Sequence, residues 1–355
     1  MPNERSRPRP QHGAGPVTLQ DVALRAGVSL ATASRALHGA GGRSVGEVLR
    51  ARVLAAAEEL SYVSNAPAQA LARASSTVVG LIVHDVADPY FAAVAAGAMR
   101  AARERQLMVM IAATFREPGM ELTYLRQLRA QRARAVVLAG SGLADPEPAR
   151  PLLREIEAFQ REGGRVVSIG DRGPEVDAVL PDQRLGAEQA VRALWNLGHR
   201  RIGVIAGPAE LTAVQQRLDG ARRALRDLGG ELPPEQVTHA DFTRSGGRAA
   251  TVDLFARTPG LTAVLALNDV MAAGCLLALR SDVGRAVPQQ VSVVGYDDVP
   301  FAVDLRPALS TVRLPLESAG AQAIGLIALE QATPARRLPL EVEFIQRDST
   351  GPAPV

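Results

Sequence analysis

Residues 17–37 read VTLQDVALRAGVSLATASRAL, and this stretch decides the architecture of the first part of the chain. Thr18 is a good helix N-cap, and Asp21 three residues later completes a short capping box. Gly27 predicts the end of that helix, because glycine readily adopts the left-handed conformation of a helix C-terminus. Ser29 then caps a second helix that fills the rest of the stretch. Two short helices joined by a glycine-containing turn indicate a helix-turn-helix.

The sequence on either side extends this motif. A third helix is expected to start at Ser44, with Glu47 completing a capping box, and to run to about Leu60. Residues 1–16 are rich in Arg and Pro and are expected to form a disordered basic arm. Apolar residues at helical spacing predict the buried side chains of the three helices. They are Leu19, Val22, Val28, Ala33, Leu37, Val48, Val53, Leu54 and Leu60.

The exposed face of the second helix carries the candidate DNA contacts. Such a helix presents its N-terminal residues to base edges in the major groove. Arg35 on that face has the two donors that guanine O6 and N7 accept, although it could equally be a solvated surface residue. Residues 1–76 hold nine Arg, no Lys and five acidic residues, a positive balance that suits an anionic partner. Hydroxyls that could hold phosphates, or serve only as caps, belong to Thr18, Ser29, Thr32 and Ser34.

From about residue 78 to 344 the pattern changes to alternating strands and helices. Continuous apolar runs separated by amphipathic segments indicate parallel sheets covered on both faces. About 275 residues exceed one comfortable core, so two α/β lobes are expected, with a ligand at the carboxyl ends of the strands. The expected strands are Val78–Val83, Leu107–Ala113, Ala135–Ala139, Arg165–Ile169, Ile202–Ala206, Ala263–Leu267 and Val291–Gly295. The expected helices are Tyr90–Arg105, Gly119–Gln131, Ala187–Leu197, Ala213–Leu228, Ser245–Ala256 and Asp269–Leu279.

Motifs in both parts of the chain resemble one protein family. They are VTLQDVALRAGVSLATASRAL, RVLAAAEELSYVSNAPAQALA, GLIVHDVADPYF, GHRRIGVIAGP, RLDG, ALNDVMAAG and VSVVGYDDVP, in this order. From Val17 to about Asp348 the chain resembles the lactose/galactose repressor (LacI/GalR) family of transcriptional regulators. The resemblance implies an all-α helix-turn-helix head and a two-lobed α/β body, like periplasmic sugar-binding proteins, with parallel sheets.

The resemblance also implies domain limits and an assembly. Family members dimerise through the body and bind double-stranded, pseudo-palindromic operator DNA, so a homodimer is expected. The expected domains are a basic arm at 1–16, a DNA-binding domain at 17–64, a hinge helix or linker at 65–76, and an effector-binding and dimerisation domain at 77–350. Within the last domain, lobe 1 is expected at about 77–175 and 306–333, and lobe 2 at about 176–305 and 334–350.

In the head, the resemblance assigns roles that spacing alone does not give. Leu30 and Ala31 match positions that discriminate between operators, yet both are apolar and can contact only thymine methyl groups or sugars. Leu71, within a segment at 66–73 that resembles the hinge helix, matches a leucine that wedges into the minor groove. Further DNA-binding candidates are His38, Tyr62, Asn65 and Ala68.

In the body, several candidate effector contacts follow expected strand ends. Tyr90 and Phe91 could wall a sugar ring, although Phe91 could simply pack into its own helix. Asn268 offers both a donor and an acceptor, and Asp269 beside it could be the N-cap of the next helix. Asp171 is a weaker candidate.

The resemblance adds three further effector contacts. Arg217 matches the arginine that grips the effector, Asp297 an acceptor for its hydroxyls, and Phe242 a position that stacks on it. Leu211 and Ala213 stand where some family members carry polar contacts, which argues mildly against a strongly anionic effector. The implied ligand is a sugar or sugar derivative.

The sequence lacks the motifs of several other function classes. The sequence has no phosphate loop, no HExxH and no nucleophile elbow, its five His are scattered, and the single Cys275 excludes an internal disulfide. We therefore expect no enzyme activity, no cofactor and no metal site. No apolar run reaches membrane-span length, and the polar N-terminus is not a signal peptide. A cytoplasmic, nucleoid-associated protein with no membrane partner is therefore expected.

These observations predict a ligand-responsive transcription factor, most plausibly a repressor. Its operator affinity would change when a small sugar-like effector binds between the two lobes. The alternatives are a sugar-binding protein without a regulatory role, and a regulator whose effector is a nucleoside or a phosphosugar.

Overall fold

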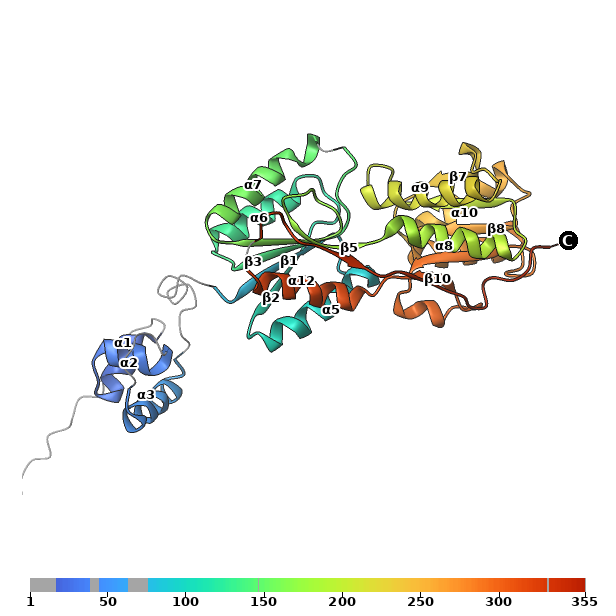
Figure 1. The fold of residues 1–355 in the computed structure, drawn as a ribbon. Helices are drawn as coiled ribbons and strands as arrows, with labels where there is room; N and C mark the ends of the chain where they lie inside the picture. The colour runs from blue at the N-terminus through green and yellow to red at the C-terminus, as the bar shows by residue number, and fades with distance from the viewer. Residues whose placement is uncertain (1–16, 39–44, 63–75, 146, 331, 355) are drawn as a thin grey trace, which may run out of the picture. The chain divides into compact units, whose positions relative to one another are not determined.

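The computed structural model of the chain describes residues 17–38, 45–62, 76–145, 147–330 and 332–354 (Figure 1). At position 38 it describes the backbone alone. The chain divides into two compact units, Met1–Ser76 and Thr77–Val355, here called the head and the body. The expected basic arm at 1–16, the expected hinge helix at 66–73 and Asn65, Ala68 and Leu71 lie outside the described residues.

The head contains the three predicted helices: α1 (Leu19–Ala26), α2 (Leu30–His38) and α3 (Glu47–Glu59). The predicted capping box is present. Thr18 Oγ1 accepts a hydrogen bond from the Asp21 amide (3.4 Å), and the Asp21 carboxylate accepts one from the Thr18 amide (2.8 Å). Gly27 ends α1 at φ 60°, as predicted, and so sets the tight turn into α2.

Small and β-branched side chains form the core of the head. Val22 of α1, Ala33 of α2 and Val53 of α3 are fully buried and meet where the three helices pack. Alanines beside them keep the helices close together. Leu19, Val28, Leu37 and Leu60, which we expected in this core, are partly buried and pack against it.

Helix α3 differs from the prediction. It begins at Glu47, and its N-cap is a glycine without a side-chain capping bond, so the expected capping box at Glu47 is wrong. Ser44, the expected cap, lies outside the described residues. Val48 is 83% exposed and Leu54 47% exposed, against the prediction that both are buried. The buried stripe of α3 runs from Val53 at helical spacing through two alanines, and Val48 and Leu54 lie off that stripe.

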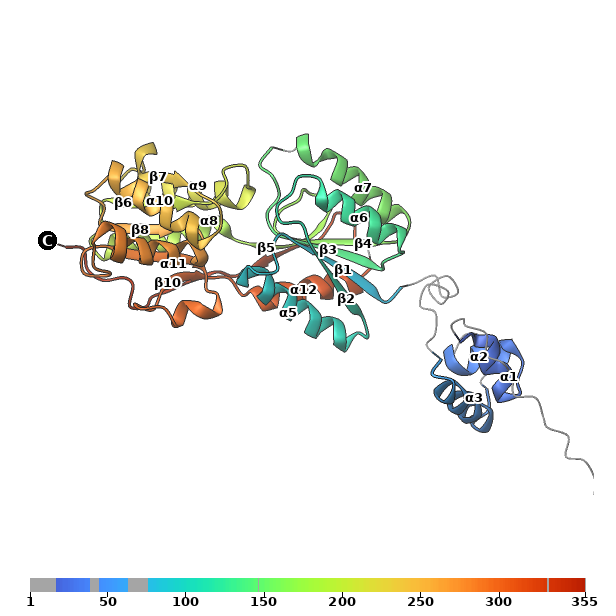
Figure 2. The same cartoon turned by 180° about the vertical axis from the view of Figure 1, so that it is seen from behind.

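The body contains two six-stranded sheets, one in each lobe (Figures 1 and 2). The pairings are parallel except that of β10 with β12, so the carboxyl ends of most strands lie at one edge of each sheet. Lobe 1 has the order β11-β5-β4-β3-β1-β2, formed by Arg337–Leu340, Asp177–Pro181, Arg165–Ile169, Ala135–Ala139, Val78–Val83 and Met108–Ala113. Lobe 2 has the order β12-β10-β9-β8-β6-β7, formed by Glu343–Ile345, Ser310–Arg313, Ser292–Asp297, Ala263–Ala266, Ile202–Ala206 and Val237–His239.

Eight helices of the described body flank these sheets. They are α5 (Pro89–Glu104), α6 (Met120–Ala130), α7 (Arg150–Arg161), α8 (Gln183–Asn196), α9 (Thr212–Asp227), α10 (Arg244–Arg257), α11 (Asp269–Ala278) and α12 (Leu316–Ala328). In lobe 1, α5 packs on α12 through glycine: a Cβ at Gly97 would lie 1.9 Å from the Glu317 carbonyl oxygen. Among the described residues, no helix is both long and apolar enough to cross a membrane.

The chain crosses between the lobes three times, and this corrects the expected lobe limits. Strand β5 pairs with β4 and so belongs to lobe 1, β10 pairs with β9 in lobe 2, and β11 pairs with β5 in lobe 1. The crossings therefore lie between β5 and α8, between β10 and α12, and between β11 and β12. Lobe 1 comprises about 77–181 and 316–340, and lobe 2 about 182–313 and 343–354.

Candidate functional site

A cavity of about 330 Å³ lies between the two lobes of the body, at the carboxyl ends of their strands. Its walls come from the ends of strands and the segments that follow them: β1, β2, β3, β4 and β5 in lobe 1 and β6, β7, β8 and β9 in lobe 2, with one residue from β11. This is where an α/β sheet binds its ligands. All seven predicted effector contacts line the cavity: Tyr90, Phe91, Asp171, Arg217, Phe242, Asn268 and Asp297.

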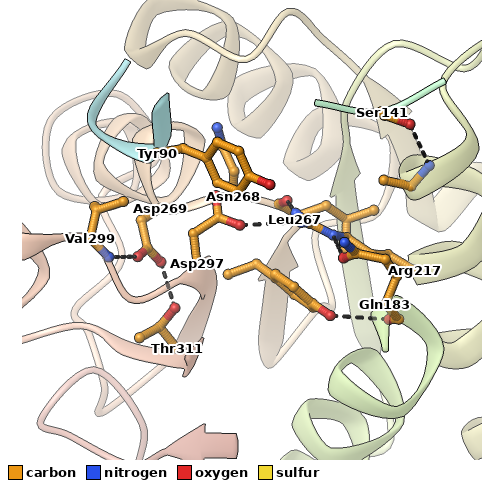
Figure 3. Close-up of polar contacts among 12 residues, drawn as sticks. Tyr90, Ser141, Gln183, Arg217, Leu267, Asn268, Asp269, Asp297, Val299 and Thr311 are labelled. Carbon is orange, nitrogen blue, oxygen red and sulfur yellow. Dashed lines mark hydrogen bonds and ion pairs between the residues drawn. The ribbon is translucent and has the colours of Figure 1, made fainter. Parts of the chain in front are cut away.

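Arg217 lies in the second turn of α9 and is 5% exposed (Figure 3). Its Nε donates to Gln183 Oε1 (2.7 Å), its Nη2 donates to Asp297 Oδ1 (3.2 Å), and its Nη1 donates to the Leu267 carbonyl. The guanidinium also lies over the Tyr296 ring, 3.7 Å from the centroid. These contacts fix the guanidinium at the lobe 2 wall of the cavity.

Asp297 ends strand β9 and is 4% exposed. Its φ of 112° is in the left-handed region, which residues with a side chain rarely adopt and which is often found at functional sites. Burial raises the pKa of Asp297 well above its ordinary value, and the positive charge of Arg217 opposes that shift. Asp297 thus places a hydrogen-bond acceptor at the cavity in a water-poor environment.

Asn268 and Asp269 have different roles from each other. Asn268 caps α11, because its Oδ1 accepts a hydrogen bond from the Met271 amide (2.7 Å), so the alternative that Asp269 is the cap is wrong. Asp269 is fully buried and accepts hydrogen bonds from the Thr311 hydroxyl (2.6 Å) and the Val299 amide (2.9 Å) (Figure 3). Burial raises the pKa of Asp269 to about 7. Asp269 therefore supports the loop after β9.

Aromatic rings form part of the lobe 1 wall. Tyr90 and Phe91 stand at the start of α5, whose N-cap is Asp88, and their rings meet edge to face with centroids 4.9 Å apart. Phe91 is 5% exposed and packs in the core while also lining the cavity, so its position is compatible with both predictions. Tyr90 presents its ring to the cavity across from Asp297 (Figure 3).

Two further lobe 1 residues lie close to these rings. His84 Nδ1 lies 3.1 Å from Thr114 Oγ1, and burial lowers the pKa of His84 to about 4, so its imidazole is neutral near pH 7. Arg116 lies over the Phe242 ring of lobe 2, with its guanidinium carbon 5.6 Å from the centroid. Phe242 therefore faces the cavity and makes a cation–π contact between the lobes.

Sequence reasoning missed several cavity residues: His84, Asp88, Arg116, Ser141 and Gln183 line the cavity but were not among the predicted contacts. Gln183 was not found because it follows β5, a strand whose sequence DAVLP contains a charge and a proline. Asp88 had a readable signal, since an Asp before Pro at a helix start is a typical N-cap.

In the head, most of the DNA-binding candidates that the structure describes lie on α2 or just before it. Leu30 is 51% exposed, Ala31 is also exposed, and the Arg35 Nε donates to the Ala31 carbonyl (3.1 Å). The Ser29 hydroxyl caps α2 by accepting from the Thr32 amide (3.2 Å). Of the other candidates, Thr18 caps α1, Ser34 and Tyr62 are half-buried, and His38 has no described side chain.

Comparison with known proteins covers both units. Residues 18–65 match the family described as bacterial regulatory proteins, lacI family, and residues 191–350 match the periplasmic binding protein-like domain. The HTH-type transcriptional regulator GalS of Salmonella typhimurium is 36% identical over 304 residues, which cover 85% of this chain and 86% of GalS. The regulator CelR of Thermobifida fusca is 34% identical over 341 residues, covering 94% and 98%.

Solved structures agree with these matches. A complex of the transcriptional regulator CelR with cellobiose has a TM-score of 0.69 at 33% identity and covers 94% of this chain and 99% of its own. A Lac repressor dimer bound to operator and to the anti-inducer ONPF has a TM-score of 0.80 at 25% identity, covering 95% and 100%. This chain belongs to the lacI family of bacterial transcriptional regulators.

Proposed function

We propose that this protein is a repressor of transcription that binds operator DNA through its head and an uncharged sugar between its lobes. The observation that carries the proposal is the cavity at the strand ends, lined by Arg217 and Asp297, in a chain that also has a helix-turn-helix. The matched CelR structure holds cellobiose and the matched Lac repressor dimer is on its operator, which supports both halves of the proposal.

The charges around the cavity favour a neutral ligand. Three arginines line it, and each already pairs with a carboxylate: Arg116 with Asp88 (3.8 Å), Arg184 with Asp219 (2.7 Å) and Arg217 with Asp297 (3.2 Å). The phosphate of a phosphosugar would have to compete with these carboxylates for an arginine side chain. A sugar hydroxyl, in contrast, can donate to Asp297 without displacing Arg217.

The rings and the volume of the cavity fit the same ligand class. Tyr90 and Phe242 line opposite lobes of the cavity and provide apolar faces for a pyranose ring. Its volume of about 330 Å³ is at the small end of the ~300–1,000 Å³ usual for ligand pockets. A mono- or disaccharide suits this space.

The function is regulatory binding, and we propose no catalysis. An effector that prefers one arrangement of the lobes changes operator affinity, and operator changes effector affinity by the same factor. We propose that the protein acts at the nucleoid of the cytoplasm, where operator DNA lies. Residues Ala66–Arg73, which resemble the hinge helix of the family, lie between the two binding regions in the chain.

A thermal-shift screen tests the effector. Galactose, glucose, cellobiose and maltose are compared with glucose 6-phosphate and cytidine as ligands of other classes. One neutral sugar should raise the unfolding temperature by mass action. A shift with the phosphosugar or nucleoside alone would contradict the proposed ligand class.

Selection of DNA from a random-sequence pool tests the other half. The purified protein should enrich pseudo-palindromic sites, and the active sugar should change its affinity for them at fixed salt. Arg35→Ala should lower that affinity about tenfold or more and relax the preference at one base pair in each half-site. Enrichment of no common sequence would contradict DNA recognition by the head.

An apolar edge of lobe 1 suits the homodimer. Strand β2 is an edge strand, and its Met108, Met110 and Ile111 are 57%, 39% and 38% exposed. Exposed apolar edge strands are covered in stable proteins, and a second copy offers the same apolar strand. We propose that this edge lies in the dimer interface. Ile111→Lys should then shift the sedimentation of the protein from dimer to monomer.

A further inference from the structure

Helix α9 differs from the other helices of lobe 2 in how its N-terminus is satisfied. The side chains of Asp182, Thr243 and Asn268 cap α8, α10 and α11, each from the residue just before its helix. The residue before α9 is Leu211, whose apolar side chain makes no capping hydrogen bond. The first amides of a helix find no acceptor within it, so α9 needs acceptors from elsewhere.

Lobe 1 supplies those acceptors. The amide of Thr212, the first residue of α9, donates to the Gly142 carbonyl (2.9 Å). The amide of Ala213 donates to the Ser141 hydroxyl oxygen (2.8 Å), a contact that joins the two lobes in Figure 3. These four residues are here called the interlobe cap. In it, one lobe completes a helix of the other.

A short antiparallel pairing lies beside the interlobe cap. Leu143 of lobe 1 bridges with Leu211 of lobe 2, and the Ala144 amide donates to the Glu210 carbonyl (2.8 Å). Gly142 allows the lobe 1 segment to run here, because a Cβ at that position would lie 2.8 Å from the Asp171 carbonyl oxygen. The backbone of both lobes is thus paired directly.

We propose that the interlobe cap holds the two lobes closed when no effector is bound and positions Arg217. Opening the lobes takes both acceptors away from the start of α9, the helix whose second turn carries Arg217. Ser141 is therefore a positioning residue that acts on the site through α9. The proposal goes beyond the function proposed above, because closure of the lobes without effector does not depend on which effector the protein binds.

The distance between the lobes in the full chain, measured without ligand, tests this proposal. Arg161 on α7 of lobe 1 and Arg226 on α9 of lobe 2 are exposed and are replaced by Cys for spin labelling. Double electron–electron resonance then gives the distribution of interlobe distances. Cys275 is fully buried and stays in place, and protein without the two new Cys shows that it takes up no label.

Two substitutions remove the interlobe cap with little damage to α9. Ser141→Ala deletes one acceptor. Thr212→Pro deletes one donor at the first position of a helix, where proline is well tolerated. Leu211 has ψ 129°, so it already has the extended backbone that a following proline requires. Thr212→Ala is the matched control that keeps the amide, and Arg244→Pro places proline at the first position of α10 outside the cap.

We expect Ser141→Ala/Thr212→Pro to lower the ratio of closed to open lobes about tenfold, which is about 1.4 kcal/mol at 25 °C. This appears as a longer, broader distance distribution, while both controls match the parent. An unchanged distribution in the double variant overturns the proposal, and so does a parent protein that is mostly open. If the double variant fails to unfold cooperatively, the interlobe distances are measured in Ser141→Ala alone. Distances in Ser141→Ala that match those of the parent also overturn the proposal.

Discussion

The two lobes each have a six-stranded sheet but offer different chemistry to the cavity between them. Lobe 2 contributes Arg217 and Asp297, two buried polar side chains that fix each other. Lobe 1 contributes the rings of Tyr90 and Phe91 and a neutral His84. The buried ion pair at the cavity thus comes from lobe 2 and most of the rings come from lobe 1, with Phe242 of lobe 2 as the exception, and each contribution can be tested separately.

Breaking the buried pair of lobe 2 should have the largest effect. Arg217→Ala strands Asp297 in a water-poor site, and removing one partner of a buried ion pair costs about 3–5 kcal/mol of unfolding free energy. Effector affinity should fall about 100-fold or more, while the folded variant keeps its operator affinity. Urea unfolding, calorimetry with the sugar from the screen, and fluorescence anisotropy with selected DNA measure the three quantities.

The double variant Arg217→Ala/Asp297→Ala serves as the control for that experiment. It removes both charges, so its unfolding free energy should exceed that of Arg217→Ala. Normal effector affinity in a folded Arg217→Ala variant would remove this residue from the ligand site.

Removing the ring from lobe 1 should have a smaller effect. Tyr90→Leu keeps an apolar side chain but loses the flat face, and effector affinity should fall about tenfold, about 1.4 kcal/mol. Tyr90→Phe keeps the ring and should stay within about twofold of the parent. Calorimetry with the sugar measures the effector affinity of both variants. Equal affinities of the Leu and Phe variants would show that the Tyr90 ring does not stack on the effector.

The lobes should also respond to pH in opposite directions. Burial lowers the pKa of His84 from 6.5 to about 4, so the folded state binds fewer protons than the unfolded state and stability falls as pH drops through this range. Burial raises the pKa of Asp269 from 3.8 to about 7, so its effect on stability is the reverse: stability falls as pH rises. Each group contributes at most about 1.4 kcal/mol per pH unit.

Chemical denaturation between about pH 4 and 7 separates the two groups. The His84→Gln variant should lose less stability than the parent on the acid side, and the Asp269→Asn variant should lose less as the pH rises. Identical profiles for both variants and the parent would mean that neither group changes its pKa on folding.

Substitution of the partly exposed Asp171, at the lobe 1 side of the cavity, should have the smallest effect on effector affinity. The Asp171 side chain is 40% exposed and pairs with Arg337 (2.8 Å), and exposed pairs contribute only about 0–1 kcal/mol. Asp171→Asn should therefore change effector affinity by about twofold or less. The same carboxylate-to-amide change in lobe 2, Asp297→Asn, is the matched control and should lose about tenfold or more. A larger loss at Asp171 would make it a direct ligand contact.

The first two helices of the head could be predicted from sequence because their signals are local. The capping box of Thr18 and Asp21 and the stop at Gly27 act within a few residues, and the structure has both. The body could be predicted only where strands are continuous apolar runs. Strand β10, with the sequence STVR, and β11, with RLPL, have no such pattern, and their place comes from pairing with distant strands.

Site residues follow the same division. Tyr90 stands at the start of the helix that follows a readable strand, so its position at the cavity could be inferred from sequence. The roles of Gln183 and Ser141 depend on partners 34 and 72 positions away, in Arg217 and in the Ala213 amide. Leu211 before α9 was visible as an apolar residue, but nothing local shows that the other lobe caps its helix.

The three crossings between the lobes have a consequence for biosynthesis. The last pieces of lobe 1, helix α12 and strand β11, are encoded after almost all of lobe 2. While the ribosome makes the intervening residues, α5 lacks the helix that packs at Gly97, and β5 has an unpaired edge. Lobe 1 can therefore complete its fold only after residues 316–340 have been synthesised, so a nascent chain that stalls before them exposes a strand edge that β11 covers in the folded protein.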